Sequence, residues 1–191
     1  MSEEPPIVVG ISGASGMPIA VRVLRALHDA RASVSLVVTD GGRTVLREEC
    51  DLDVDSLRPW VTHLYSDNDL AAPIASGSVP TKGMVVVPCS NNTVAKIALG
   101  LGDTLLTRAA AVHLKERRRF IVVPRETPLS TTLLRHLTTL SELGTVVLVA
   151  SPAYYLRPKS VEETTDYLAG KVLDHLGLEH QLYRGWKAGT P

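Results

Sequence analysis

The sequence is poor in aromatic residues, cysteine and net charge, and each shortage excludes a class of protein. Phe, Trp and Tyr make up 4% of the 191 residues, too few for the stacking surfaces that bind single-stranded nucleic acid. Lys+Arg and Asp+Glu balance at 20 each, so no overall field attracts nucleic acid or an anionic membrane. Cys50 and Cys89 lie far apart, and the six histidines show no metal-ligand spacing. We therefore expect no nucleic acid partner and no bound metal.

Long apolar runs and a basic leader are also missing. No apolar run approaches the ~18–20 residues of a membrane helix, and the first six residues are acidic rather than basic. These features predict a cytoplasmic protein with no membrane contact. A hydrophobic content of 45% is sufficient for a substantial core. We expect one domain over residues 1–191, with residues 178–191 forming a C-terminal tail.

Strand-like and helix-like patterns alternate along the chain. Apolar runs predict strands over about 7–9, 33–38, 83–87, 120–123 and 145–150. Helices are predicted over 17–27, from a Gly41-Gly42 turn to about Glu49, and over 94–101, 103–115, 130–143 and 160–176. Residues 68–78 are expected to form a short helix that leads into a small-residue loop, Ala75–Ser78, and residues 51–66 are not assigned. The expected fold is a three-layer, Rossmann-like (flavodoxin-like) α/β fold, a parallel sheet with helices on both faces.

The segment Gly10–Gly16, with the sequence GISGASG, follows the first strand and precedes the first helix. A glycine-rich turn at a helix N-terminus is typical of a phosphate site, because backbone N–H groups and the helix dipole converge there. The spacing is neither G-x-G-x-x-G, since Ser12 replaces the second glycine, nor G-x-x-x-x-G-K-[ST], since no lysine follows. A phosphorylated ligand other than a standard dinucleotide or nucleoside triphosphate is therefore expected.

Polar residues follow four of the expected strands. They are Ser12–Ser15, Thr39, Ser90–Thr93 and the pair Arg125-Glu126. The carboxyl ends of parallel strands share one edge of a sheet, where ligands bind. Helix capping by Ser90 and a simple turn at Thr39 remain alternatives.

Arg108 and Lys115 lie seven residues apart on one expected helix and so share a face. Together with Arg125 they could bind a second phosphate. Solvated surface charge is the alternative interpretation.

Seven segments in order along the chain resemble the flavin prenyltransferase family of UbiX type. They are Gly10–Gly16, Ala75–Ser78, Pro88–Ser90, Arg108–Ala110, Leu114–Arg118, Pro124–Pro128 and Tyr155–Pro158. The resemblance implies a metal-independent transferase that joins a dimethylallyl group, carried by dimethylallyl phosphate, to N5 and C6 of reduced FMN. It also implies that the prenylated FMN serves a UbiD-type decarboxylase. It further implies a homo-dodecamer with active sites at subunit interfaces.

The resemblance also implies roles for individual residues. FMN would lie against Gly13, Ala14, Ser15, Thr39, Ser90, Asn91, Asn92, Thr93 and Arg125. The substrate phosphate would be held by Arg108, Lys115, Arg125, Tyr155 and Lys171. Ser15, Glu49, Lys115 and Glu126 are the implied catalytic residues, and we expect Glu126 to support proton transfer together with Ser15. Thr39 stands where Ser is common, and Lys171 where Arg is common, which replaces a bidentate phosphate contact by a point charge.

Two other functions remain as alternatives. An FMN-dependent cysteine decarboxylase would carry a similar segment at Ser90–Ile97, but such enzymes have a Pro-x-Met-Asn motif where this chain reads Pro124-Arg125-Glu126-Thr127-Pro128. A non-catalytic FMN carrier subunit of a decarboxylase is the other alternative. A carrier would not need a second group of cations for a second phosphate.

Overall fold

Six parallel strands form one sheet in the order β3-β2-β1-β4-β5-β6. The structure is a computed structural model that describes residues 4–185. The strands are β1 (Ile7–Ile11), β2 (Val34–Val38), β3 (His63–Ser66), β4 (Gly83–Cys89), β5 (Phe120–Pro124) and β6 (Val146–Val147). The chain moves outward from β1 in one direction and from β4 in the other, so the order reverses between these two central strands. Such a switch point leaves a crevice at the carboxyl ends of the strands.

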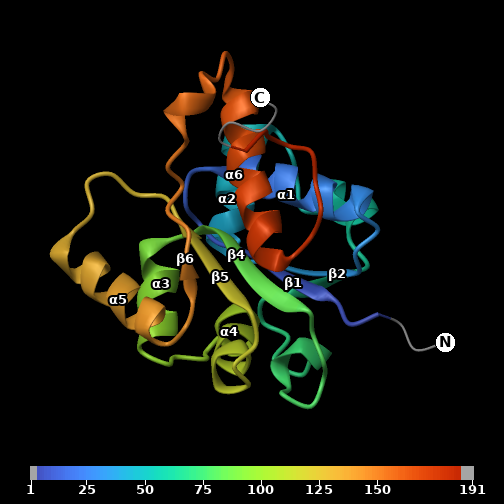
Figure 1. The fold of residues 1–191 in the computed structure, drawn as a ribbon. Coiled ribbons are helices and arrows are strands. Elements are labelled where there is room, and N and C mark those ends of the chain that lie inside the picture. Colours follow the sequence, from blue (N-terminus) through green and yellow to red (C-terminus); the bar gives the residue numbers. More distant parts are fainter. Residues whose placement is uncertain (1–3, 186–191) are drawn as a thin grey trace.

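Helices cover both faces of the sheet (Figure 1). They are α1 (Met17–Asp29), α2 (Asp40–Cys50), α3 (Asn91–Ala98), α4 (Leu105–Lys115), α5 (Thr131–Glu142) and α6 (Val161–Leu176), with single 3-10 segments η1 (Asp55–Trp60), η2 (Pro73–Ala75) and η3 (Tyr154–Leu156). Helices α1, α2 and α6 lie on one face, and α3, α4 and α5 lie on the other. The expected three-layer α/β fold is confirmed.

Alternation along the central strands supplies both layers of the core. In β1, Ile7, Val9 and Ile11 pack into the cluster shared with α1 and α6. Val8 points to the opposite face, into the cluster shared with α3, α4 and α5. Every residue of β1, β2, β4 and β5 is buried. This burial explains why these strands read as continuous apolar runs rather than as an alternating pattern.

The prediction of a Gly41-Gly42 turn was wrong, because both glycines lie in the first turn of α2. They are needed there for close approach. A Cβ atom at Gly42 would lie 2.7 Å from the carbonyl oxygen of Ile11, and one at Gly41 would lie 3.2 Å from Cα of Gly13. The paired glycines thus let the start of α2 pack against the end of β1 and the loop that follows it.

Two further element predictions need correction. Within residues 68–78, the 3-10 segment Pro73–Ala75 stands in place of the short helix expected before the small-residue loop. The strand expected over 145–150 is ladder-paired only at Val146–Val147, although Leu148 and Ala150 still donate backbone hydrogen bonds to carbonyls of β5. The first segment lies in the connection from β3 to β4, and the second is the edge strand of the sheet. The local sequence pattern alone does not determine the hydrogen bonding of such segments.

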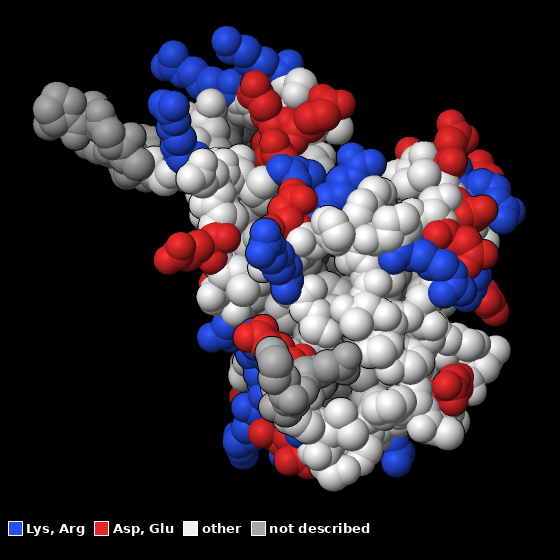
Figure 2. Space-filling model, turned by 90° about the vertical axis from the view of Figure 1, so that its right-hand side faces the viewer, with Lys and Arg blue, Asp and Glu red and all other residues white. Residues whose placement is uncertain are grey.

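On the face shown in Figure 2, acidic and basic side chains intermingle around a broad uncharged area. This mixture agrees with the balanced composition of the chain. Among residues 4–185, no helix combines the length and apolar character required to cross a membrane.

Candidate active site

A cavity of about 610 Å³ lies at the switch point, beyond the carboxyl ends of β1 and β4. It is lined by Gly13, Ala14, Ser15, Thr39, Asp40, Gly41, Asp67, Ser90, Asn91, Asn92, Thr93, Lys96, Thr104, Leu106, Thr107, Arg125 and Glu126. All nine residues expected to bind a cofactor are therefore brought to one cavity. The volume falls within the range of pockets that enclose small molecules and cofactors.

Ser12 fixes the two central loops relative to each other. Its hydroxyl is buried, donates to the carbonyl of Pro88 at 3.0 Å and accepts from the amide of Ser90 at 2.8 Å. The loop after β1 is thereby joined to the loop after β4. The polar residue that breaks the dinucleotide-binding pattern is consequently a structural link rather than a ligand contact.

Helices α2, α3 and α4 begin at the cavity wall, and hydroxyl side chains cap each of them. Thr39 accepts from the amide of Gly42 at 3.0 Å, and Ser90 accepts from the amide of Thr93 at 3.3 Å. Thr104 forms a reciprocal capping box with Thr107. Thr39 and Ser90 therefore both cap a helix and line the cavity. The positive ends of the three helices lie at the cavity.

The N-terminus of α1 is already occupied by an anion of the protein itself. One carboxylate oxygen of Glu49, in the last turn of α2, accepts from the amides of Gly16 and Met17 at 2.9 Å each. These two amides therefore hold a carboxylate of the protein itself. The expected phosphate contact at Gly13, Ala14 and Ser15, which line the cavity, stays a prediction.

Glu49 is also bonded to the hydroxyl of Ser15. Partial burial opposes its ionisation, but the bonds from Ser15, Gly16 and Met17, together with the charge of Arg125, outweigh that effect and lower the pKa of Glu49. Glu49 is therefore a carboxylate at neutral pH, and Ser15 has a proton acceptor directly behind it.

Glu126, which we expected to support proton transfer together with Ser15, bonds to one residue of α3 and to the next residue of its own loop. It accepts from the side-chain amide of Asn91 at 2.5 Å and from the backbone amide of Thr127 at 3.0 Å. Its neighbour Arg125 donates to the backbone carbonyl of Ser15 at 3.3 Å. The loop after β5 thus contacts both central loops, and Glu126 lines the same cavity as Ser15.

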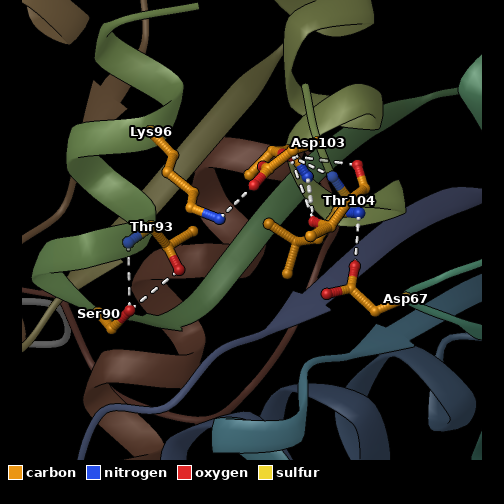
Figure 3. Close-up of polar contacts among 8 residues, drawn as sticks. Asp67, Ser90, Thr93, Lys96, Asp103 and Thr104 are labelled. Carbon is orange, nitrogen blue, oxygen red and sulfur yellow. Dashed lines mark hydrogen bonds and ion pairs between the residues drawn. The ribbon is translucent and has the colours of Figure 1, made fainter. Parts of the chain in front are cut away.

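Figure 3 shows a polar wall that the sequence did not reveal. Lys96 of α3 bonds to Asp103 at 2.6 Å, and the Asp67 carboxylate accepts from the amide of Leu106 at 2.9 Å. Asp67, Lys96 and Thr104 all line the cavity. The segment Asp103-Thr104 could be recognised in the sequence as a helix start. Nothing in the local sequence indicated that Asp67, from a distant loop, accepts a hydrogen bond from the first turn of this helix.

The residues expected to bind the substrate phosphate are not assembled within one chain. Arg125 lines the main cavity, whereas Arg108 and Lys115 of α4 line a second pocket of about 460 Å³ beside the loop Ala75–Gly77. Lys115 bonds to Glu116 at 2.7 Å. Tyr155 lies in η3 and is 46% exposed.

Lys171 belongs to a cluster that holds the tail on α6. Asp174 accepts from Lys171 at 2.9 Å and from Tyr183 at 2.5 Å, and it contacts His180 at 3.0 Å. A Cβ atom at Gly170 would lie 2.6 Å from the Tyr183 ring, so the glycine admits the tail. Residues 178–185 of the expected tail are described, and residues 186–191 lie outside the described chain.

Asp174 is the charged centre of this cluster. Burial opposes ionisation of its carboxyl, but hydrogen bonds from Tyr183, Lys171 and His180 outweigh it and lower its pKa from 3.8 to about 2. Within residues 4–185, no group of three His, Cys, Asp or Glu side chains is placed to hold a metal ion.

Residues 1–173 match the model of the Flavoprotein family. The protein is therefore a flavoprotein. The flavin prenyltransferase UbiX of Thermoplasma acidophilum is 50% identical over 182 residues, which cover 94% of this chain and 99% of the relative. The chain belongs to the UbiX flavin prenyltransferases.

Solved structures agree with this assignment. A UbiX crystal structure in complex with FMN and dimethylallyl pyrophosphate superposes with a TM-score of 0.94, at 36% identity, covering 97% of this chain and 99% of the other. A dodecameric protein from Escherichia coli, named an FMN-dependent UbiX-like decarboxylase, has a TM-score of 0.93 at 37% identity, covering 96% and 100% of the two chains.

Proposed function

We propose that the protein transfers the dimethylallyl group of dimethylallyl phosphate to N5 and C6 of reduced FMN. The main support for this proposal is the cavity at the switch point, which residues of the loops after β1, β4 and β5 line together. Membership in the UbiX flavin prenyltransferases supports the same activity. The reaction product is the prenylated FMN that a UbiD-type decarboxylase uses.

The lining of the cavity fits FMN. Hydroxyl and amide groups of Ser15, Thr39 and Ser90–Thr93 offer hydrogen bonds, and Lys96 and Arg125 supply positive charge for an anionic ligand. Bound reduced FMN supplies the electron-rich ring that accepts the allyl group.

The Ser15–Glu49 pair is suited to move a proton at the cavity wall. The ionised Glu49 accepts the hydroxyl hydrogen of Ser15, which leaves the Ser15 oxygen able to accept a proton from a group in the cavity. Loss of the C6 proton during ring closure requires such a base. We assign this role to Glu49 acting through Ser15, in place of Glu126.

Cations around the donor phosphate stabilise the negative charge that develops as the C–O bond breaks. Arg108, Lys115, Arg125, Tyr155 and Lys171 remain our proposed phosphate ligands. Since a single chain keeps the Arg108–Lys115 pocket apart from the main cavity, we propose that neighbouring copies in a homo-dodecamer bring the two together.

Mixed assemblies test this arrangement. Ser15→Ala and Lys115→Ala should each be inactive, but subunits refolded together should regain activity, because some sites would combine an intact cavity with an intact lysine. Continued inactivity of an assembly shown to contain both variants would contradict a shared site.

The activity itself is tested by mass spectrometry. The protein is incubated without oxygen with FMN, dithionite and dimethylallyl phosphate, and in parallel with the diphosphate. We expect the flavin to gain one five-carbon unit, with faster conversion of the monophosphate. Absence of a gain with either donor would refute the transferase function and favour a carrier of FMN. Loss of CO₂ from a cysteine-terminated peptide would instead favour the cysteine decarboxylase alternative.

A further inference from the structure

The pocket that contains Arg108 and Lys115 has a wall of very small residues. Besides the two cations it is lined by Ala75, Ser76, Gly77, Ala111 and Val112. It shares no lining residue with the cavity at the switch point. The two cations come from α4, whereas the opposite wall is a loop between η2 and β4. The shape of this pocket therefore depends on how that loop is held.

The loop lies directly against the end of α4 at Gly77. A Cβ atom on Gly77 would lie 2.7 Å from Nζ of Lys115 and closer still to the carboxylate of Glu116. A side chain at position 77 would therefore require the flexible ends of Lys115 and Glu116 to move. A shift of the loop by about 1 Å would consequently change the surroundings of Lys115.

Arg118, three residues beyond α4, holds the loop in this position. Its guanidinium donates to the carbonyls of Gly77 at 2.5 Å and Val79 at 2.8 Å, and to the hydroxyl of Thr81 at 3.4 Å. The planar fork of arginine suits two separate carbonyl acceptors, which the point charge of a lysine does not match. The arginine thus spans five residues of the loop with one side chain.

His113 supports the same loop from within the core. It is fully buried; Nδ1 lies 2.7 Å from the carbonyl of Ala109 and Nε2 lies 2.8 Å from the Thr81 hydroxyl. Burial and the charge of Arg118 lower its pKa, against the effects of hydrogen bonds to the backbone of Ala109 and of Gly83. Since a carbonyl only accepts, Nδ1 carries the proton and Nε2 accepts from Thr81. The Thr81 oxygen then remains able to accept from Arg118.

We propose that Arg118 is a positioning residue for the prenyl donor: it fixes residues 76–81, and through Gly77 it sets the place of Lys115 in the donor-phosphate pocket. His113 serves as the neutral anchor of the far end of this loop. The proposal rests on the proposed function in one respect, namely that Arg108 and Lys115 bind the donor phosphate. The fixing of the loop itself does not depend on that function.

Three variants test it. Arg118→Gln removes the charged fork, Arg118→Lys keeps the charge, and Arg117→Gln alters an exposed neighbouring arginine outside this network. In Arg118→Gln we expect hydrogen exchange of the backbone amides of Ser78, Val79, Thr81 and Lys82 to rise roughly tenfold. The KM for dimethylallyl phosphate should rise by a similar factor, with the FMN dissociation constant and kcat nearly unchanged. Arg118→Lys should restore part of each effect, and Arg117→Gln should match the wild type.

Unchanged loop exchange in a folded Arg118→Gln protein would overturn the proposal. Equal losses of donor and FMN affinity would overturn it as well, because they would indicate a general structural role. Should Arg118→Gln not fold, Thr81→Val removes only the shared hydroxyl and should still raise exchange at residues 79–82. Hydrogen exchange is measured without substrate, so it reports on the loop whether or not the protein transfers prenyl groups. A wild-type protein without transferase activity would refute the proposed function, and the exchange result would still decide whether Arg118 positions the loop.

Discussion

Replacing Glu49 by glutamine tests the proton-transfer role most directly. The amide oxygen of the new side chain can still accept from the backbone amides of Gly16 and Met17, since both bonds use the same carboxylate oxygen of Glu49. The charge is lost, however, and with it part of the favourable interaction with the start of α1. Because Glu49 is exposed, the cost to stability should be small, about 1 kcal/mol.

The effect on catalysis should be much larger. The amide oxygen can still accept a hydrogen bond from Ser15, but an amide is not a base, so the side chain behind Ser15 can no longer take up a proton. Loss of a positioned general base lowers rates by about 100- to 10,000-fold. We expect a decrease of that size in kcat for prenyl transfer, with FMN affinity retained.

The measurement is single-turnover conversion of reduced FMN, followed by mass spectrometry in the absence of oxygen. Glu48→Gln, on the same helix and also exposed, is the matched control and should behave like the wild type. Because the pKa of Glu49 is lowered, its carboxylate persists to below pH 4.5, and the wild-type rate should not fall on this account between pH 8 and 5. A Glu49→Gln enzyme with nearly normal kcat would refute the reasoning.

Three further predictions concern stability. Gly42→Ala should cost about 2 kcal/mol of folding stability, because the added carbon would lie 2.7 Å from a β1 carbonyl; the loss is measured as a lower denaturant midpoint. The control is Gly102→Ala, where the nearest atom would be 3.6 Å from the added carbon and the midpoint should hardly change. Equal midpoints for the two variants would contradict the packing argument. Ser12→Ala should cost about 1–3 kcal/mol by the same assay, since it removes both hydrogen bonds of the Ser12 hydroxyl and leaves the partly buried amide of Ser90 without this acceptor. Asp174→Asn should speed hydrogen exchange in residues 180–185. As its folded pKa is about 2 against 3.8, the wild-type tail should stay protected down to about pH 4 and lose protection as pH falls toward 2; protection retained at pH 2 would show that Asp174 does not hold the tail.

Local pattern was sufficient for most of the fold. The buried parallel strands can be recognised as apolar runs in the sequence. Hydroxyl residues such as Thr39 and Ser90 indicate helix starts, because their side chains accept hydrogen bonds from backbone amides of the first helical turn. The Gly41-Gly42 turn failed for a physical reason. Two glycines signal a turn when only the local chain is considered, whereas here they serve a contact with β1 and its loop.

The order of the segments along the chain was sufficient for the family and for the nine expected cofactor-binding residues, all of which line the cavity. Sequence could not determine which acid partners Ser15, because Glu49 and Glu126 lie 34 and 111 residues away along the chain and only the packing of α2 against the β1 loop brings Glu49 to it. The same holds for Asp67 at the start of α4 and for Arg118 on the loop at Gly77.

The sequence by itself therefore determined the layers and the strand-end polar groups, since these depend on periodicity and on short motifs. The flavin-related chemistry came from the resemblance of seven segments to a known family. Only the tertiary structure decided the pairings: Glu49 with Ser15, Asp174 with Lys171, and Arg118 with its loop. Hydrogen bonds and ion pairs act over about 3 Å, so they depend on side-chain positions that are set by the packing of distant segments and not by the residues next to them in the chain.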